Sequence, residues 1–175
     1  MNQILTCLAL PAPDSLRRGV FPDPDAPVTL PPATGRALSA AQLALVPPAL
    51  LPACPSARPD ASLNGVDMGA WRGMPLKDVP PTDLARWVTD PGFAPPGGQS
   101  RAAHLGHMRA WLAGLPRTPA HLCVAADAAV IRAIVVAALG GTPAMLSKLD
   151  IAPPSTTRLT RHTGWRVAVA GAPLS

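Results

Sequence analysis

Short apolar runs along the chain predict its regular elements. Residues 3–9 (Gln-Ile-Leu-Thr-Cys-Leu-Ala) and 122–126 have the length of buried strands. Residues 128–139 form an almost wholly apolar, alanine-rich run that predicts a buried helix, and Gly140 follows it where a helix is expected to end. A buried strand that leads directly into a buried helix is typical of an α/β fold.

The first half of the chain has weaker patterns. Residues 14–32 and 47–62 are rich in proline and turn residues, and they predict irregular connections. Residues 35–46 show helical spacing of their apolar side chains before Pro47 and Pro48. Residues 63–73 hold several glycines and one tryptophan, which favours a folded-back loop pinned by Trp71.

The second half has clearer patterns. Ser100 is expected to cap the N-terminus of a helix that extends to Leu115 and carries an apolar stripe. A short helix is expected within residues 76–89, ending near Trp87, and two strands at 156–161 and 165–170. The pattern as a whole predicts one layered α/β domain over residues 1–175, with a mainly parallel sheet flanked by helices.

Composition narrows the range of partners. Apolar residues make up 48% of the 175-residue chain, charged residues 14%, and the formal net charge is +5. A basic surface favours anionic ligands. Nucleic acid is not an expected partner, because no lysine and arginine run is dense enough and the aromatics are not interleaved with arginines.

Cysteine spacing and hydropathy predict no cofactor and no membrane contact. Cys7, Cys54 and Cys123 are odd in number and lack metal or redox spacing, so no metal or other cofactor is expected. The apolar start has no basic flank typical of a signal peptide, and Arg132 interrupts the longest apolar run. We therefore expect a cytoplasmic protein.

Three polar side chains, one at a predicted strand end and two on a predicted helix, have two interpretations each. Asp127 lies where residues 122–126 end, the edge at which α/β folds place their sites. It is expected to cap the following helix, and the alternative is a group that binds a cation or an amine. His104 and His107 lie off the apolar stripe of their helix, so a solvated face is expected, with a shared metal or a substitute base as the alternative.

Four stretches carry a family resemblance. They are Leu63-Asn-Gly-Val-Asp-Met-Gly-Ala-Trp-Arg-Gly73, Trp87 to Ser100 with its Pro-Gly-Gly-Gln-Ser ending, Leu122 to Ala133, and Ile151-x-Pro…Ser155-x-Thr157…Gly164-Trp165. Their order and spacing resemble the histidine phosphatase superfamily, the phosphoglycerate mutase-like fold, and its short single-domain bacterial members in particular. The resemblance implies that the chain is a three-layer sandwich of this fold, with a shortened N-terminal half.

The resemblance also implies a mechanism. In this family a histidine after the first strand attacks phosphorus, two arginines and a second histidine neutralise the phosphoryl oxygens, and a carboxylic acid protonates the leaving group. An alignment of the family's loop on Gly19 and Phe21 places Leu10 at the nucleophile and Ala9 at the first arginine. The matching stretches at 63–73 and 122–133 place Gly65 at the acid and Asp127 at the second histidine.

The remaining family positions are less certain from the residues. The second arginine is either Arg58, in Cys54-Pro-Ser-Ala-Arg58, or Arg36. Arg17 and Arg18 are further candidates for holding an anion. Trp71 and Asp67 are candidates for lining the pocket, and for Trp71 the expected role is a packing anchor, with the pocket mouth as the alternative.

These substitutions predict a pseudo-phosphatase that has lost phosphotransfer and keeps a binding or regulatory role. Its expected partner is an anionic small molecule or a protein. One alternative is an active phosphomonoester hydrolase of the alpha-ribazole phosphatase or phosphoglycerate mutase-like type with a relocated nucleophile. Another is a module that acts through protein contacts alone, since a fold by itself implies no activity.

Overall fold

A six-stranded sheet forms the centre of the protein, as seen in a computed structural model that describes residues 2–24, 26 and 28–174. The strand order is β3-β2-β4-β1-β5-β6. The first four strands in that order are parallel, and β5 is antiparallel to both of its neighbours, which makes a mixed but mainly parallel sheet. The strands are β1 (Gln3–Ala9), β2 (Leu43–Val46), β3 (Arg58–Pro59), β4 (His121–Ala126), β5 (Ser155–Arg161) and β6 (Trp165–Pro173).

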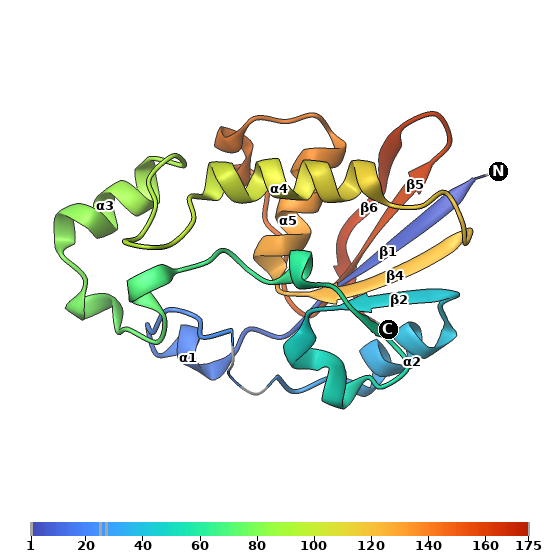
Figure 1. Cartoon of the computed structure of the whole chain (residues 1–175), viewed down its shortest axis with the longest axis horizontal. Helices are drawn as coiled ribbons and strands as arrows, with labels where there is room; N and C mark the ends of the chain where they lie inside the picture. The colour runs from blue at the N-terminus through green and yellow to red at the C-terminus, as the bar shows by residue number, and fades with distance from the viewer. Residues whose placement is uncertain (1, 25, 27, 175) are drawn as a thin grey trace.

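Helices cover both faces of the sheet (Figure 1), as the sequence predicts. Alternate residues of β1 and β4 point to opposite faces. Leu5 and Val124 pack with α4 (Arg101–Gly114) and α5 (Ala128–Ala138), whereas Leu8 and Ala125 pack with α2 (Pro32–Ala40). The remaining helices are α1 (Asp14–Arg17), α3 (Pro81–Thr89) and 3₁₀ helices at Pro48–Ala53, Ala61–Leu63, Gly69–Trp71, Leu76–Asp78 and Pro143–Ser147.

The strand and helix around Asp127 confirm the strongest sequence prediction. Strand β4 ends at Ala126, and α5 begins at Ala128. The Val130 N–H donates to Asp127 Oδ1 at 2.7 Å, so Asp127 caps the helix as expected. Ser100 caps α4 in the same way, since the Ala103 N–H donates to its hydroxyl at 3.0 Å.

The helix predicted over residues 35–46 is wrong in its second half. Helix α2 ends at Ala40, and Leu43–Val46 forms β2, in which Leu43 pairs with Leu122 of β4. A four-residue apolar run fits either element, and the parallel ladder with β4 decides in favour of the strand. The two predicted loops also hold short elements, namely α1 in the first and β3 in the second.

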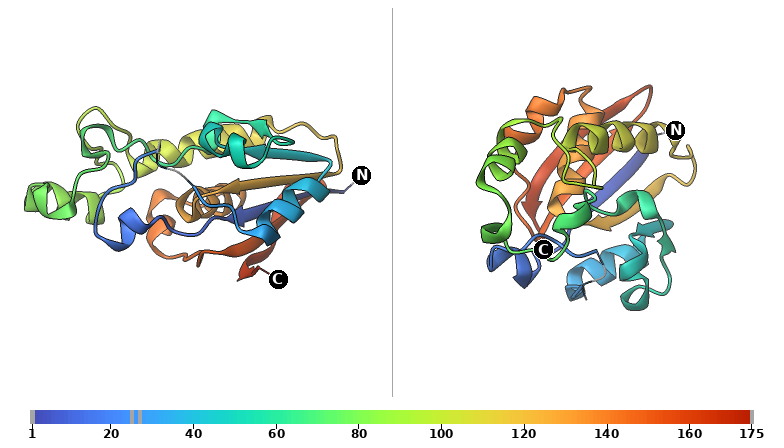
Figure 2. Two further views of the ribbon diagram at one scale, coloured as in Figure 1. Left: turned by 90° about the horizontal axis from the view of Figure 1, so that it is seen from below. Right: turned by 60° about the vertical axis from the view of Figure 1, so that its left-hand side comes forward.

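An aromatic cluster forms a second, smaller core away from the sheet. Trp71 is 3% exposed, and its ring lies 5.1 Å from that of Phe21, 6.1 Å from that of Trp87 and 5.9 Å from that of Phe93. This confirms the loop pinned by Trp71. The cluster packs residues 63–100, which include α3, against Phe21. Helix α3 lies at the end of the molecule farthest from the sheet (Figures 1 and 2).

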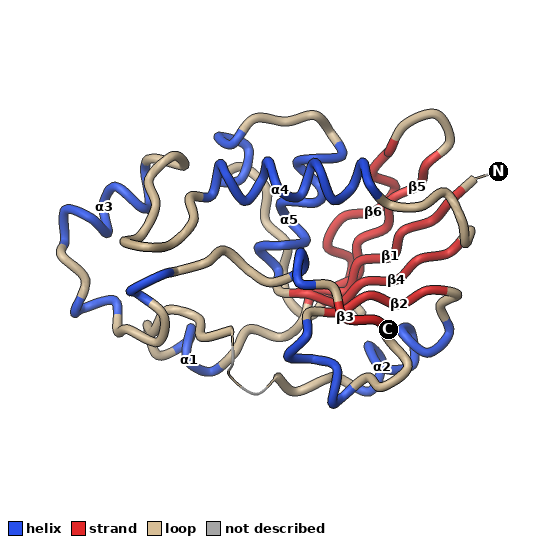
Figure 3. Tube along the Cα trace, viewed as in Figure 1, coloured by secondary structure: helices blue, strands red, loops and turns tan. Residues whose placement is uncertain are grey.

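Irregular backbone makes up much of the region between α3 and the sheet (Figure 3). The irregular connection predicted over residues 14–32 includes residues 25 and 27, which lie outside the described residues. Among the helices described, none is long and apolar enough to cross a membrane. Cys7 and Cys123 are buried in β1 and β4, and burial raises the pKa of both thiols, that of Cys123 to about 12.

Candidate functional site

A cavity of about 630 Å³ lies at the carboxyl ends of β1 and β4. Ala9 and Ala126 are register partners at the ends of these neighbouring strands, and the Leu10 N–H donates to the Ala126 carbonyl at 2.9 Å. The next residue of each strand, Leu10 and Asp127, therefore lines the cavity. Carboxyl ends of parallel strands are the usual place for ligand sites in α/β folds.

The end of β1 contributes only hydrocarbon to this cavity. Leu10 is 7% exposed and packs in one cluster with Leu38 and Leu50. Ala9, the preceding residue, is buried in the sheet and is not among the described lining residues. Neither side chain offers a lone pair or a charge.

The end of β4 contributes a carboxyl group. Burial raises the pKa of Asp127, although the backbone N–H donors of Val130 and Ala129 favour its ionised form. Among the described residues, Asp127 forms no salt bridge. The cavity wall therefore holds an acid that gains hydrogen bonds from a helix N-terminus and, from beyond salt-bridge distance, the charge of Arg132.

Gly65 fits against this carboxyl group. A Cβ atom at position 65 would lie 2.5 Å from Asp127 Oδ2, closer than real Cβ contacts allow. Both residues line the cavity. In this arrangement a side chain at position 65 would have to displace the carboxylate of Asp127.

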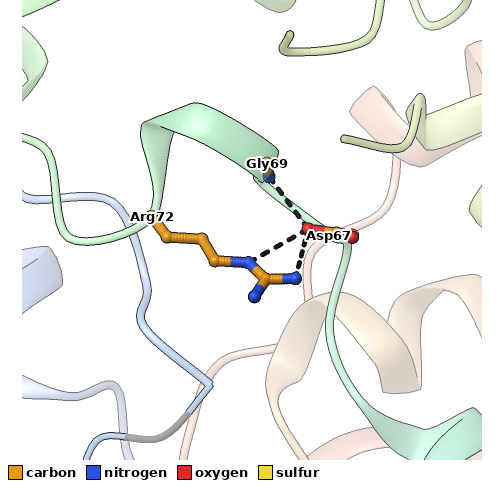
Figure 4. A network of polar contacts seen from close by, with 3 residues as sticks. All are labelled: Asp67, Gly69 and Arg72. Carbon is orange, nitrogen blue, oxygen red and sulfur yellow. Dashed lines mark hydrogen bonds and ion pairs between the residues drawn. The ribbon is translucent and has the colours of Figure 1, made fainter. Parts of the chain in front are cut away.

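Asp67 lies in the cavity lining and is held by two groups (Figure 4). Its Oδ1 accepts the Gly69 N–H at 2.8 Å and the Arg72 guanidinium at 2.7 Å. The Gly69 hydrogen bond and then Arg72 lower the pKa of Asp67. Arg72 also lines the cavity, and sequence analysis missed it because its spacing from Asp67 matches no helical or strand period.

The described lining carries nearly balanced charge and no family nucleophile. Arg17 and Arg18 are exposed and line the cavity from α1 and its end, as proposed for an anion site. Neither histidine nor cysteine occurs among the described lining residues. The charged ones are the acids Asp14, Asp23, Asp67 and Asp127 and the arginines Arg17, Arg18 and Arg72.

Three candidates from the sequence are not part of the described lining. Arg36 is exposed on α2, and Arg58 is exposed on β3, the edge strand beside β2. Trp71 faces the aromatic cluster instead of the cavity mouth, because three neighbouring rings enclose it. Neither candidate for the second family arginine lies at the cavity.

The expectation of a solvated face for both histidines of α4 is wrong for His104. His107 is exposed, but His104 is only 4% exposed. His104 precedes the buried Met108 by four residues, so the two share one side of the helix. Burial, and then the nearby His107, lowers the pKa of His104 to about 4.

A second cavity of about 190 Å³ adjoins the first. His104 and His107 line it from α4, and Asn64, Gly65 and Asp67 line both cavities. Among the residues that the structure describes, no group of three or more His, Cys, Asp or Glu side chains is arranged to hold a metal ion. The two cavities therefore share part of their lining.

Comparisons with known proteins point to one family. The model of the histidine phosphatase superfamily (branch 1) matches residues 35–171. This match begins earlier in the chain than the resemblance found from its motifs, which starts at residue 63. No curated protein matches the chain.

Solved structures of similar fold include phosphatases. A mycobacterial glucosyl-3-phosphoglycerate phosphatase in complex with VO3 is 23% identical, with a TM-score of 0.76 over 98% of this chain and 100% of that one. The alpha-ribazole phosphatase from Shigella flexneri is 13% identical, with a TM-score of 0.77 over 97% of this chain and 96% of that one. At these identities the likeness shows the fold alone.

Proposed function

The chain belongs to the histidine phosphatase superfamily, and from this premise we propose that it binds a ligand in the cavity without transferring a phosphoryl group. The cavity occupies the place where α/β folds bind ligands, and it is large enough for a small molecule. The proposal thus keeps ligand binding in the cavity and excludes the phosphoryl transfer that the family carries out.

The composition of the cavity lining carries this proposal. The family resemblance implies a histidine nucleophile at position 10, and Leu10 has no lone pair with which to attack phosphorus. Its side chain belongs to the core, and no imidazole or thiol among the described lining residues takes over its place. Loss of a nucleophile reduces enzyme rates by many orders of magnitude.

Asp127 adds a second obstacle to phosphoryl transfer. The family resemblance implies that the side chain at position 127 neutralises phosphoryl oxygens, whereas an ionised carboxylate repels them. Two unit charges about 4 Å apart interact by about 1 kcal/mol in water and about 4 kcal/mol at an effective dielectric constant of 20. An anionic ligand is therefore expected to lie toward Arg17 and Arg18 and away from Asp127.

Two measurements on the purified protein test the proposal. We expect hydrolysis of para-nitrophenyl phosphate to stay at the level of the reagent blank between pH 5 and 9. We also expect phosphate or vanadate to raise the melting temperature, because a ligand that binds only the folded state stabilises it. The rise should shrink in an Arg17→Gln/Arg18→Gln variant and persist in an Arg36→Gln/Arg58→Gln variant, which removes the same charge outside the described lining.

Turnover by the unmodified protein would favour the second candidate, an active phosphomonoester hydrolase with a relocated nucleophile. One observation supports that candidate: Ser15 lines the cavity, and its buried hydroxyl has no hydrogen-bond partner. Turnover that disappears in Ser15→Ala would establish it. A blank assay together with no thermal shift from either anion would instead favour a module that acts through protein contacts.

A further inference from the structure

The Asp127 carboxyl group lies at the large cavity with no side chain bound to it. Its described hydrogen bonds come from the backbone N–H groups of Val130 and Ala129. The charge of Arg132 reaches it only from beyond salt-bridge distance, and Arg132 is itself paired with Asp150 at 3.1 Å. Asp127 is partly exposed, and neither of its carboxyl oxygens is both enclosed and unpaired. The carboxyl group therefore keeps surface open toward the cavity that it lines.

The cavity wall beside this carboxyl group supplies few hydrogen-bond donors. The Leu10 N–H already donates to the Ala126 carbonyl, and the next residue, Pro11, has no N–H. Further prolines of the described lining are Pro13, Pro22, Pro24 and Pro47. Because a proline offers a carbonyl acceptor and no backbone donor, this lining complements a ligand that brings donors of its own.

An ionised carboxylate at this place is unfavourable without a nearby cation. Burial raises the pKa of Asp127, because it disfavours the charged form. A cationic group of a ligand would offset this effect, since charges removed from water are stable when they are paired and hydrogen-bonded. An ammonium group meets both needs, because it is positively charged and carries only donors.

The opposite charge comes from another segment of the lining. Arg17 and Arg18 line the cavity from α1 and its end, and among the described residues neither forms a salt bridge. Asp14 and Asp23 line the cavity as well, so its charge is nearly balanced. A cavity with both signs of charge favours a ligand that also carries both over a ligand with several negative charges.

We infer that the cavity binds a zwitterionic small molecule, whose ammonium group pairs with Asp127 and whose anionic group pairs with Arg17 and Arg18. This assignment rests on the proposed binding function of the cavity and adds the chemical class of its ligand. The acid at the end of β4 then has a role in ligand recognition besides capping α5.

Calorimetric titration with matched pairs of compounds tests this assignment. The pairs are ω-aminoalkylphosphonates and the alkylphosphonates of the same length, from ethyl to pentyl, at pH 7, where the amine is charged. We expect the amine to strengthen binding at least about tenfold in one or more pairs, because close pairs of opposite charge at binding interfaces couple by this much or more.

Two variants assign the ends of the ligand. Asp127→Asn keeps the helix cap, since asparagine caps about as well, and it should abolish the advantage of the amine. Arg17→Gln/Arg18→Gln should weaken both members of each pair and leave the advantage of the amine in place. Asp78→Asn is the matched control for the lost carboxylate, because Asp78 is exposed and outside the described lining, and it should change neither result.

The outcomes separate this assignment from the proposed function. If alkylphosphonates bind but the amine adds nothing at any chain length, or if its advantage survives in Asp127→Asn, the zwitterionic ligand is overturned and anion binding in the cavity stands. If no phosphonate binds, and phosphate and vanadate leave the melting temperature unchanged, the proposed binding function fails together with it.

Discussion

Strands β1 and β4 end side by side at the cavity, yet the residues that follow them have opposite character. The two strands run parallel to each other, and Ala9 and Ala126 are register partners at their ends. After β1 the chain places Leu10 in the hydrophobic core, and after β4 it places Asp127 at the N-terminus of α5. The same backbone framework therefore supports an apolar side chain on one strand and a carboxylate on the next.

The difference follows from what each strand leads into. Strand β4 enters α5 directly, and the free N–H groups of that helix stabilise an acceptor at position 127. Strand β1 leads into residues 11–13, where prolines replace N–H donors, and α1 begins without a side-chain cap. At the end of β4, the N–H groups of α5 favour a polar side chain. At the end of β1 there are no such donors, so packing alone determines the residue.

Leu10→Ala should have the largest effect on stability. The side chain is nearly enclosed by the core, so its truncation should cost about 3 kcal/mol of unfolding free energy, near the lower end for buried leucines because one side faces the cavity. Urea denaturation measures this loss. Leu10→Met, which keeps the volume, should cost less than about 1.5 kcal/mol. A loss below 1 kcal/mol for the alanine variant would mean that Leu10 is not part of the core, and the contrast between the strands would weaken.

Gly65→Ala should have the next largest effect, and that effect should depend on Asp127. The new methyl group would displace Asp127 Oδ2 and disturb the helix cap, at a cost of about 1 to 2 kcal/mol. In an Asp127→Ala background, which itself costs about 1 kcal/mol for the lost cap, the same change should cost little. The coupling in this double-mutant cycle should be about 1 kcal/mol by denaturant unfolding. Additive losses would show that the two positions do not compete for space.

The sequence predicts the elements whose patterns are local. Residues 122–126 and 128–139 form a strand and a helix within a residue of their predicted ends, and Ser100 and Asp127 cap helices, because apolar period and cap chemistry act over a few neighbours. Strand β2 escaped prediction, since its pairing with β4 joins residues far apart in the chain.

The site itself was predictable only in part. Leu10, Gly65, Asp67 and Asp127 line one cavity as the family resemblance implies, because these positions follow motif spacing. Position alone does not reveal the contact between Gly65 and Asp127 or the burial of His104, which arise from segments packed across the fold. The arginines Arg36 and Arg58 matched a motif that is too short to fix their place.

Asp127→Asn should have the smallest effect, with a distinctive dependence on pH. Asparagine caps helices about as well as aspartate, so the variant keeps the cap and removes only the charge. Because the pKa of Asp127 is raised in the folded state, the folded protein binds more protons than the unfolded chain between the two pKa values. Stability of the unmodified protein therefore falls as pH rises through that window, whereas the asparagine variant lacks this loss.

Urea unfolding of both proteins from pH 3.5 to pH 8 measures this difference. As pH rises above the ordinary pKa of aspartate, the free energy of unfolding of the asparagine variant should increase relative to that of the unmodified protein. This relative increase should level off above the folded-state pKa. Asp78→Asn, at an exposed position outside the cavity, controls for the loss of one negative charge. If the stability of the asparagine variant instead falls relative to that of the unmodified protein as pH rises, the N–H donors of α5 outweigh burial. The end of β4 would then favour an ionised carboxylate over an uncharged cap.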